Sequence, residues 1–458
     1  MKFYSTRSKA VDSARDNDTR FLDAVRTGLA PDGGLYLPRV WPKFSVQDFS
    51  HEVSKNFSTT GAFHEVSVKL LTPFLCEDFT PVEITSIVET AFSFPLVIKK
   101  AKPDLSVLEL FHGPTAAFKD FGARFLAQAL AHAQGKSENN RDRKRSCVLV
   151  ATSGDTGAAV AAAFHAATLG NSDIEVFVLY PQGRVSSRQE KQLTAWGGNV
   201  RSFQVEGSFD DCQRLVKEVF QSHDKSDSNN SIQNINWISA NSINLGRWLP
   251  QTCAFAYASL KHFQETGQKI SFSVPTGNLG NGLAAMVAKK MGFPIRKVLL
   301  ASNANHSVTD FFQTLKFSAH PSIATLANAM DIGNPSNMER LQALWPSAEA
   351  LSQLKSWVSA VSVSDAQILE QIEKTFQETG EVICPHTATA IYAAEKAGGD
   401  WTVAATAHPS KFPEVSMRHA QVKIPEALQE LLDRPGRFEV LAPNLDAFVK
   451  ILSESPKN

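Results

Sequence analysis

The sequence has little cysteine and no surplus of charge. Its 458 residues include 46 Lys or Arg and 46 Asp or Glu, so the formal net charge is zero. A protein that binds nucleic acid usually needs a surplus of cations to displace phosphate counterions. The five cysteines are scattered, with no C-x-x-C pair and no zinc-type spacing. We therefore expect no nucleic-acid partner, no metal site and no disulfide framework, with cysteines that are reduced and mostly buried.

Long hydrophobic runs are also missing. No stretch approaches the ~18 to 20 apolar residues that cross a bilayer, and the N-terminal segment turns polar too early for a secretory signal. We expect no membrane contact and a cytoplasmic location.

Four common catalytic signatures are absent too: the phosphate-binding P-loop, H-E-x-x-H, G-x-S-x-G, and G-x-G-x-x-G after a strand. The sequence therefore contains no motif that indicates P-loop ATP hydrolysis, zinc-protease chemistry or serine-hydrolase chemistry.

What is present is the pattern of a packed α/β protein. Hydrophobic residues make up 43% and charged residues 20%, as in ordinary globular proteins, and the length suggests two or three domains. From about residue 105, short apolar runs alternate with Ala-rich helical runs; the apolar runs include SVLEL, SCVLVATS, IEVFVLYP, ISFSVP, RKVLLASN and WTVAATA. This alternation predicts parallel β-α units, with helices on both faces of parallel sheets.

Two polar tracts, at 135–146 and 221–234, bracket one block of these units and read as surface connections. We therefore expect four parts: an N-terminal domain, a large domain made of two segments, a small mobile domain inserted between them, and a C-terminal helical segment. The predicted boundaries are 1–100 for the first, 101–146 and 235–425 for the large domain, 147–234 for the small domain, and 426–458 for the last.

The helical pattern around residues 116–133 contains a lysine in an unusual position. Asp120 and Arg124 are spaced as an i,i+4 pair that we expect to face solvent. Lys119 lies off that face, on a stripe of small and apolar residues: Ala116, Ala123, Leu126 and Leu130. Desolvation there would lower the pKa of the lysine and free a nucleophilic amine. The alternative is an ordinary surface lysine whose stem covers apolar neighbours.

A glycine-rich turn in VPTGNLGNGLAAM (274–286) follows a predicted strand and precedes a helix. Its backbone N–H groups and the positive end of that helix could bind one phosphate; the candidate residues are Gly277, Asn278, Leu279, Gly280 and Asn281. Since no P-loop lysine is present, a cofactor monophosphate fits better than a nucleoside triphosphate. The alternative is a plain strand-to-helix loop.

A third turn, in ATSGDTGAAVAAAF (151–164), offers a polar rim. Ser153, Asp155 and Thr156, with the neighbouring glycines, could bind a substrate carboxylate. Capping of the Ala-rich helix by Asp155 or Thr156 explains the same residues without any ligand.

Together, HGPTAAFKDFGAR (112–124), SGDTG (153–157) and PTGNLGN (275–281) resemble the threonine synthases, which are pyridoxal-phosphate enzymes of fold type II. Further segments resemble the longer form of that family in the same order: STR (5–7), APDGGLYLP (30–38), QEKQLTAWGGNV (189–200), NSINLGR (241–247), AMDIGNPSNMER (329–340), PHTATA (385–390) and ATAHPSKFPE (405–414). The resemblance implies a fold like that of the tryptophan synthase β subunit, with an N-terminal extension.

The resemblance also implies the cofactor contacts. Lys119 would hold pyridoxal 5'-phosphate as a Schiff base, the 277–281 turn would bind its phosphate, and Thr406 would meet the pyridine nitrogen. The family usually has Phe in place of Leu279, Asp at Asn281, Gly at Ser8 and Asp at Cys384, so this chain departs from the pattern at four positions.

The implied reaction converts O-phospho-L-homoserine and water to L-threonine and phosphate. Lys119 is then the natural base for the α proton. Arg247, Asn244 and Thr115 are candidates for the substrate phosphate, because a guanidinium suits phosphate; a surface ion pair is the alternative for Arg247. His112 is either a proton carrier or a structural histidine. Two alternative functions stay open: a related phospho-lyase that releases 2-oxobutyrate, and a binding protein that has lost catalysis.

Overall fold

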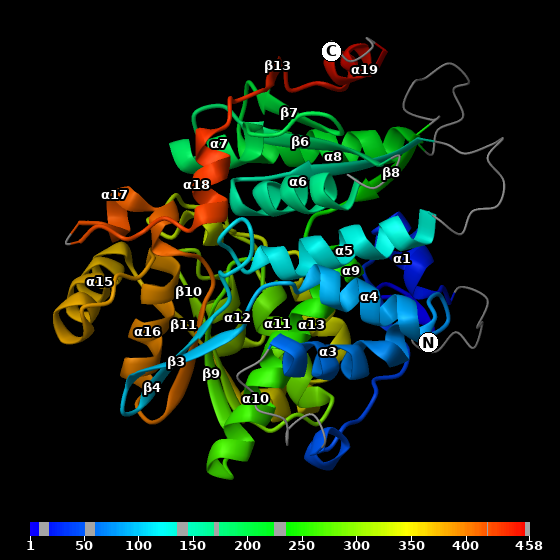
Figure 1. The fold of residues 1–458 in the computed structure, drawn as a ribbon. Coiled ribbons are helices and arrows are strands. Elements are labelled where there is room, and N and C mark those ends of the chain that lie inside the picture. The colour runs from blue at the N-terminus through cyan, green and yellow to red at the C-terminus, as the bar shows by residue number, and fades with distance from the viewer. Residues whose placement is uncertain are drawn as a thin grey trace.

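The computed structural model describes residues 1–8, 18–50, 60–134, 145–168, 174–223, 235–418 and 420–453. Two sheets of mostly parallel strands, each flanked by helices, lie one above the other in Figure 1, with helices α5 (Lys119–Gln134) and α6 (Asp155–Thr168) between them. This confirms the predicted α/β class with parallel sheets.

The six-stranded sheet forms the lower half of Figure 1. Only its edge strand β3 (Val97–Lys102) is antiparallel to its neighbour; the order is β11 (Val358–Ser362), β10 (Ile295–Ser302), β9 (Ile270–Pro275), β12 (Trp401–Ala405), β4 (Leu105–Glu109) and β3. Every residue of β9 and β12 is buried, as expected for central parallel strands covered on both faces. Along β10, Leu299 and Ala301 pack with helix α16 (Pro385–Ala397), whereas Val298 and Leu300 belong to the main core on the other face.

The five-stranded sheet is parallel throughout. Its order is β13 (Glu439–Leu441), β7 (Val200–Val205), β6 (Ile174–Pro181), β5 (Arg145–Ala151) and β8 (Ile235–Ser239). Strand β8 begins one residue beyond the boundary predicted for the small domain, and β13 comes from the segment predicted to be helical. The five-stranded sheet therefore includes two strands, β8 and β13, from outside the residues predicted for the small domain. The division into domains stays a prediction.

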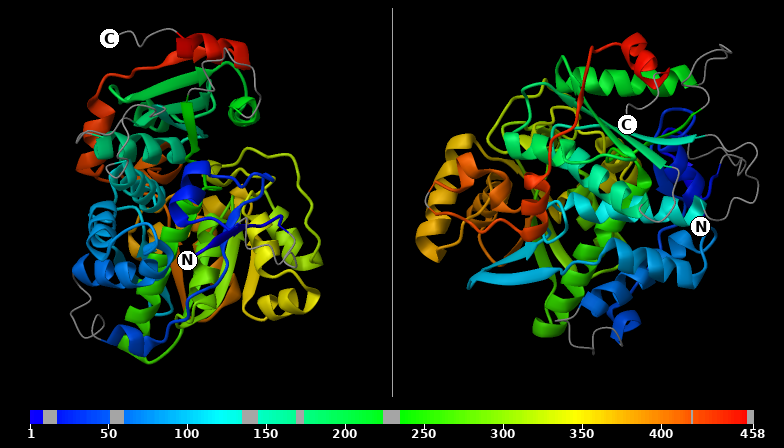
Figure 2. Two further views of the ribbon diagram at one scale, coloured as in Figure 1. Left: turned by 90° about the vertical axis from the view of Figure 1, so that its right-hand side faces the viewer. Right: turned by 45° about the horizontal axis from the view of Figure 1, so that its top comes forward.

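The N-terminal part packs against the outer side of α5, as the right-hand view of Figure 2 shows in blue. It contains the antiparallel pair β1 (Phe3–Ser5) and β2 (Tyr36–Pro38) with α1 (Phe21–Thr27), η2 (Val46–Phe49), α3 (Thr60–Leu75) and α4 (Pro81–Ala91). The remaining helices are α7 (Ser187–Thr194), α8 (Phe209–His223), α9 (Leu245–Trp248), η3 (Leu249–Gln251), α10 (Thr252–Thr266), α11 (Gly280–Lys290), α12 (Ser307–Thr314), η4 (Asn328–Met330), α13 (Met338–Leu344), α14 (Ala348–Lys355), α15 (Asp365–Thr379), η5 (Pro409–Lys411), α17 (Pro413–Ser416), α18 (Glu426–Asp433) and α19 (Leu445–Ser453).

One helical prediction is wrong. Asp120 does not face solvent: it is 1% exposed, and its carboxylate accepts hydrogen bonds from the backbone N–H and the hydroxyl of Thr115. Arg124 donates instead to the carbonyls of Ala91 and Thr90. The reason is that α5 begins only at Lys119, so Asp120 lies in the first helical turn and its side chain caps the loop before it.

Two exclusions from composition can be compared with the structure. All five cysteines are free, and only Cys76 is exposed. No helix among the described residues combines the length and the apolar character needed to span a membrane.

The C-terminal helix α19 closes the outer face of the five-stranded sheet. Its buried Phe448 packs against the rings of Phe177, Phe203 and Trp237, with centroid distances of 6.0 Å for each pair. Aromatic rings that meet edge to face contribute beyond the area that they bury. This cluster packs the C-terminal helix against strands that lie more than two hundred residues earlier in the sequence.

Phe448→Ala should therefore lower the free energy of unfolding by about 3 kcal/mol, because it leaves a cavity among the three rings. Val440→Ala, at an exposed position of the same segment, is the control and should change it by about 0.5 kcal/mol or less. Urea titration followed by tryptophan fluorescence measures both. Equal effects of the two substitutions would contradict a packing role for α19.

Candidate active site

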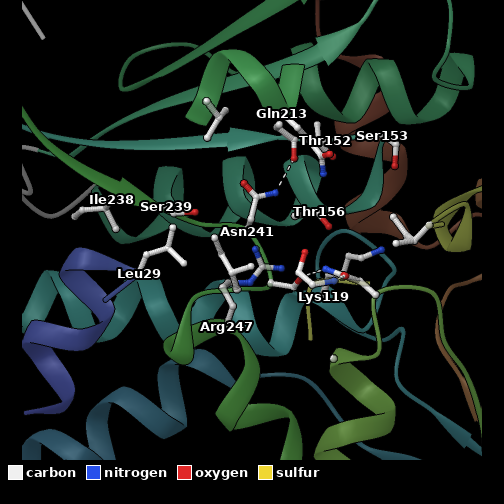
Figure 3. Close-up of a pocket in the computed structure, with 18 of the residues that line it drawn as sticks. Leu29, Lys119, Thr152, Ser153, Thr156, Gln213, Ile238, Ser239, Asn241 and Arg247 are labelled. Atoms are coloured by element: carbon white, nitrogen blue, oxygen red, sulfur yellow. Dashed lines mark hydrogen bonds between the residues drawn. The ribbon is translucent and has the colours of Figure 1, made fainter. Parts of the chain in front are cut away.

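A cavity of about 1820 Å³ opens between the two sheets. Segments that follow the carboxyl ends of strands β4, β5, β8, β9 and β12 all reach it, as is usual for ligand sites of parallel sheets. In Figure 3, Thr152, Ser153 and Thr156 lie on the upper wall, and Lys119 and Arg247 lie on the lower wall.

Lys119 is held at the start of α5 by pairing of the preceding turn with the segment after β12. The N–H of Phe118 donates to the carbonyl of Thr406 at 2.8 Å, and the N–H of His408 donates to the carbonyl of Ala116 at 3.0 Å. Lys119 and Thr406 both line the cavity. Burial lowers the pKa of the Lys119 amine; nearby Asp155 opposes this shift, while the positive charges of Lys411 and Arg247 add to it. These surroundings agree with the expected desolvation of the amine, and the role of Lys119 stays a prediction.

Asp155, the first residue of α6, lies between two lysines. Its Oδ1 is 2.8 Å from the Nζ of Lys411, and its Oδ2 is 3.9 Å from the Nζ of Lys119. Burial alone would raise the pKa of Asp155, but the two lysines outweigh that effect and hold it well below its ordinary value. The carboxylate is therefore charged in the folded protein, and Ser153 and Thr156 lie on either side of it along the cavity wall.

Sequence reasoning missed three buried residues beside Asp155. Lys411 is 1% exposed and also donates to the carbonyl of Thr115 at 2.8 Å. Gln189 donates to Asp155 at 3.2 Å. His386 lines the cavity; its Nε2 accepts from the N–H of Ala329 at 3.2 Å, and no described residue hydrogen-bonds its buried Nδ1. All three lie in segments that carry the family resemblance, yet nothing in their spacing shows that they meet.

The glycine turn joins β9 to α11. Leu279 adopts φ 61°, a left-handed conformation that is rare outside glycine, immediately before the helix begins. A Cβ at Gly277 would lie 2.6 Å from the Cα of Met330, so glycine is required there for packing, whereas at Gly280 the nearest atom would be 3.6 Å away. The amide of Asn281 is used within the turn, donating to the carbonyl of Pro275 and accepting from Thr276. An anion at this turn would therefore be bound by backbone N–H groups rather than by the Asn281 side chain.

Arg247 brings a second positive charge to the cavity. It is 2% exposed, and its guanidinium donates to the carbonyl of Ala240, while no described residue accepts a hydrogen bond from its buried Nε. Burial lowers its pKa to about 10, with Asp120 opposing the shift. A surface ion pair, the alternative considered from sequence, is excluded by this burial.

Three other sequence candidates lie away from the cavity. Thr115 is fully buried, with its hydroxyl bonded to Asp120. Asn244 caps α9 and donates to the carbonyls of Val25 and Ser239, so both ends of its amide are occupied. His112 pairs with Glu109 at 2.7 Å and does not line the cavity. The structure gives these side chains structural partners.

These features define a class: a desolvated lysine at a helix start, facing a cavity that an anion-binding turn also lines, on a type II fold. The family described as "Pyridoxal-phosphate dependent enzyme" matches residues 96–405, and the chain uses pyridoxal phosphate as its cofactor. Two narrower matches, "Threonine synthase N terminus" over 2–92 and "Threonine synthase, C-terminal" over 387–451, flank it. The chain belongs to the threonine synthase family.

The chain is similar to individual threonine synthases over nearly its whole length. The chain is 34% identical to threonine synthase of Serratia marcescens over 465 residues, which cover all of both chains. It is similar to the crystal structure of threonine synthase from Escherichia coli, with 33% identity and a TM-score of 0.83 over 99% of each chain. It is also similar to the structure of pyridoxal-phosphate-bound threonine synthase from Brucella melitensis, with 31% identity and a TM-score of 0.86 over 99% of this chain and 98% of that one.

The buried His386 predicts a pH dependence of stability. Burial lowers its pKa from 6.5 to about 4. Between these values the unfolded chain binds a proton that the folded chain does not, so stability falls as the pH falls through this window. The free energy of unfolding of the parent should therefore fall between about pH 7 and about pH 5. In His386→Gln this fall should be smaller by about 2 kcal/mol.

Urea titrations of both proteins at the two pH values measure this difference. His408, whose pKa burial also lowers to about 4, is present in both proteins and cancels in the comparison. Identical pH slopes would show that His386 is not buried in the neutral form.

Proposed function

We propose that this chain converts O-phospho-L-homoserine and water to L-threonine and phosphate, with Lys119 as the residue that holds the cofactor and moves the protons. The observation that carries the assignment is the position of Lys119: its Nζ lies 3.9 Å from the carboxylate of Asp155, and its side chain, only 17% exposed, lines a cavity that the 275–281 turn and Arg247 also line.

The site residues suit pyridoxal phosphate. Lys119 offers an amine for the Schiff base whose pKa burial lowers, and the start of the eleven-residue helix α11 offers backbone N–H groups for the phosphate. Thr406, which lines the same cavity, would meet the ring nitrogen with a hydroxyl rather than a carboxylate. When bound, the cofactor withdraws electrons from the carbons next to the substrate amine and so stabilises negative charge there.

The protein's own groups would divide the remaining work. The Lys119 amine, whose pKa burial lowers, takes the α proton and carries protons between neighbouring carbons of the substrate. The polar rim of Ser153, Asp155 and Thr156 binds the amino-acid end of the substrate through backbone N–H groups and hydroxyls. The positively charged Arg247 binds the phosphate that leaves.

The first test follows the product. The purified holoenzyme should release threonine and phosphate in equal amounts, whereas the alternative phospho-lyase would release 2-oxobutyrate. Lys119→Ala should lose the visible cofactor band and about 10³-fold in turnover, because it lacks the amine that forms the Schiff base and transfers the protons. A borohydride-stable adduct in that variant would contradict the assignment of Lys119, and retention of full turnover would contradict its catalytic role.

The second test concerns the leaving phosphate. Arg247→Lys keeps the charge but loses the planar fork, so kcat/KM for the phosphorylated substrate should fall about tenfold to hundredfold, with unchanged cofactor affinity. Arg296→Lys, at an exposed position that bonds Ser271, is the matched control and should keep its activity. Steady-state kinetics and cofactor titration measure both. Loss of cofactor with unchanged kcat/KM in the reloaded enzyme would place Arg247 with the cofactor instead.

The small mobile domain and the cytoplasmic location stay predictions. Ser153, Asp155 and Thr156 come from the unit of the five-stranded sheet, and Lys119 and the glycine turn come from the unit of the six-stranded sheet. This arrangement supports a site between two units, which is the geometry that closure on a substrate requires.

A further inference from the structure

A cluster of two histidines and one aspartate lies at the N-terminal end of α12, outside the residues that line the active-site cavity. His306 precedes the helix, Asp310 lies one turn further on, and His320 comes from the loop that follows the helix. The Nδ1 of His306 is 2.6 Å from the Oδ2 of Asp310, and the Nε2 of His320 is 3.2 Å from the same oxygen. All three ligand atoms lie within 4.8 Å of one another.

We propose that His306, Asp310 and His320 form a zinc-binding site. Zinc bonds of about 2.0 to 2.2 Å in a tetrahedron place ligand atoms roughly 3.4 Å apart. The two separations to Asp310, 2.6 and 3.2 Å, are shorter than that value, and the two histidine nitrogens lie within 4.8 Å of each other. The side chains, which are 34% to 46% exposed, have room to adjust. Two imidazoles and one carboxylate suit Zn²⁺, whereas Mg²⁺ and Ca²⁺ prefer ligands that are all oxygen. Water would complete the coordination.

The backbone already holds the ligands together. The N–H of His320 donates to the carbonyl of Gly333 at 3.0 Å, and the hydroxyl of Ser307, next to His306, donates to the same carbonyl at 2.6 Å. A Cβ on Gly333 would lie 1.9 Å from the carbonyl oxygen of His320, so this close approach requires glycine. Both histidines are therefore fixed relative to one peptide group, which lowers the entropy lost when a metal binds.

Gly333 lies within a segment that forms one wall of the active-site cavity. Several neighbours of Gly333 line that cavity: Ala329, Met330, Ile332, Asn334 and Ser336. The N–H of Ser336 donates to Asn278 of the glycine turn at 2.5 Å, and the N–H of Ala329 donates to His386. Zinc on the cluster would fix the 306–320 segment around Gly333 and so restrain this wall of the cavity.

The test titrates Zn²⁺ into untagged, chelator-treated holoenzyme by calorimetry. A Cys76→Ser background removes the exposed thiol as a competing ligand. We expect one site per chain with micromolar affinity, at least tenfold weaker binding in His320→Gln and in Asp310→Asn, and unchanged binding in the control His262→Gln, whose residue lies on α10 outside the cluster. A millimolar Kd, equal affinity in all four proteins, or competition by excess Mg²⁺ would overturn the proposal.

Hydrogen exchange provides an independent readout. Zn²⁺ should slow amide exchange at least threefold over residues 320–336 in the parent protein and leave it unchanged in His320→Gln. Because the cluster is exposed, circular dichroism should show that both cluster variants keep the fold. Zinc binding without this protection would retain the metal site and overturn its restraint of the cavity wall.

Discussion

The structure depends most on the buried carboxylate of Asp155 and the two lysines on either side of it. An ionised group buried without partners would cost several kcal/mol, so the position of Asp155 is tolerable only where Lys411 and Gln189 contact it. Lys119 is 3.9 Å away on the other side, and burial lowers the pKa of its amine while Asp155 opposes this shift. With Arg247 also present, the charges around Lys119 favour a phosphorylated ligand.

Close backbone approaches keep these charges in place. A Cβ at Gly122 would lie 2.1 Å from the carbonyl oxygen of Arg247, so α5 and α9 touch through their backbones. The first turn of α5 places Lys119 in the cavity, and the first residues of α9 place Arg247 there. A change in the spacing of these two helices would therefore move the amine and the guanidinium relative to each other, although neither side chain lies in the contact.

The sequence allowed the parts of the fold that depend on local pattern to be predicted. Apolar runs and Ala-rich helices identified the parallel units. The apolar stripe left two interpretations of Lys119 open, and the family resemblance favoured the cofactor lysine. Asp120 was misplaced because helical periodicity was extended back to residue 116, whereas the helix begins at Lys119. Lys411 and His386 could not be found in this way, since their partner Asp155 lies more than 200 residues earlier in the chain. The same holds for His320, which meets His306 only because the loop folds back against Gly333.

The contacts across the cavity limit how its two halves can move. Lys411 joins Asp155, at the start of α6, to the carbonyl of Thr115, in the loop before α5. Gln192 of α7 donates to that same carbonyl at 3.3 Å, and Arg188 of α7 donates to the carbonyl of Ser410. These bonds already link the five-stranded unit to the six-stranded unit at one side of the cavity. If the two units close on a ligand, the motion would either pivot about this side or exchange the Lys411 contact for one with the ligand. A pivot about this side would keep Asp155 beside Lys119, so the carboxylate would continue to influence the charge of the amine.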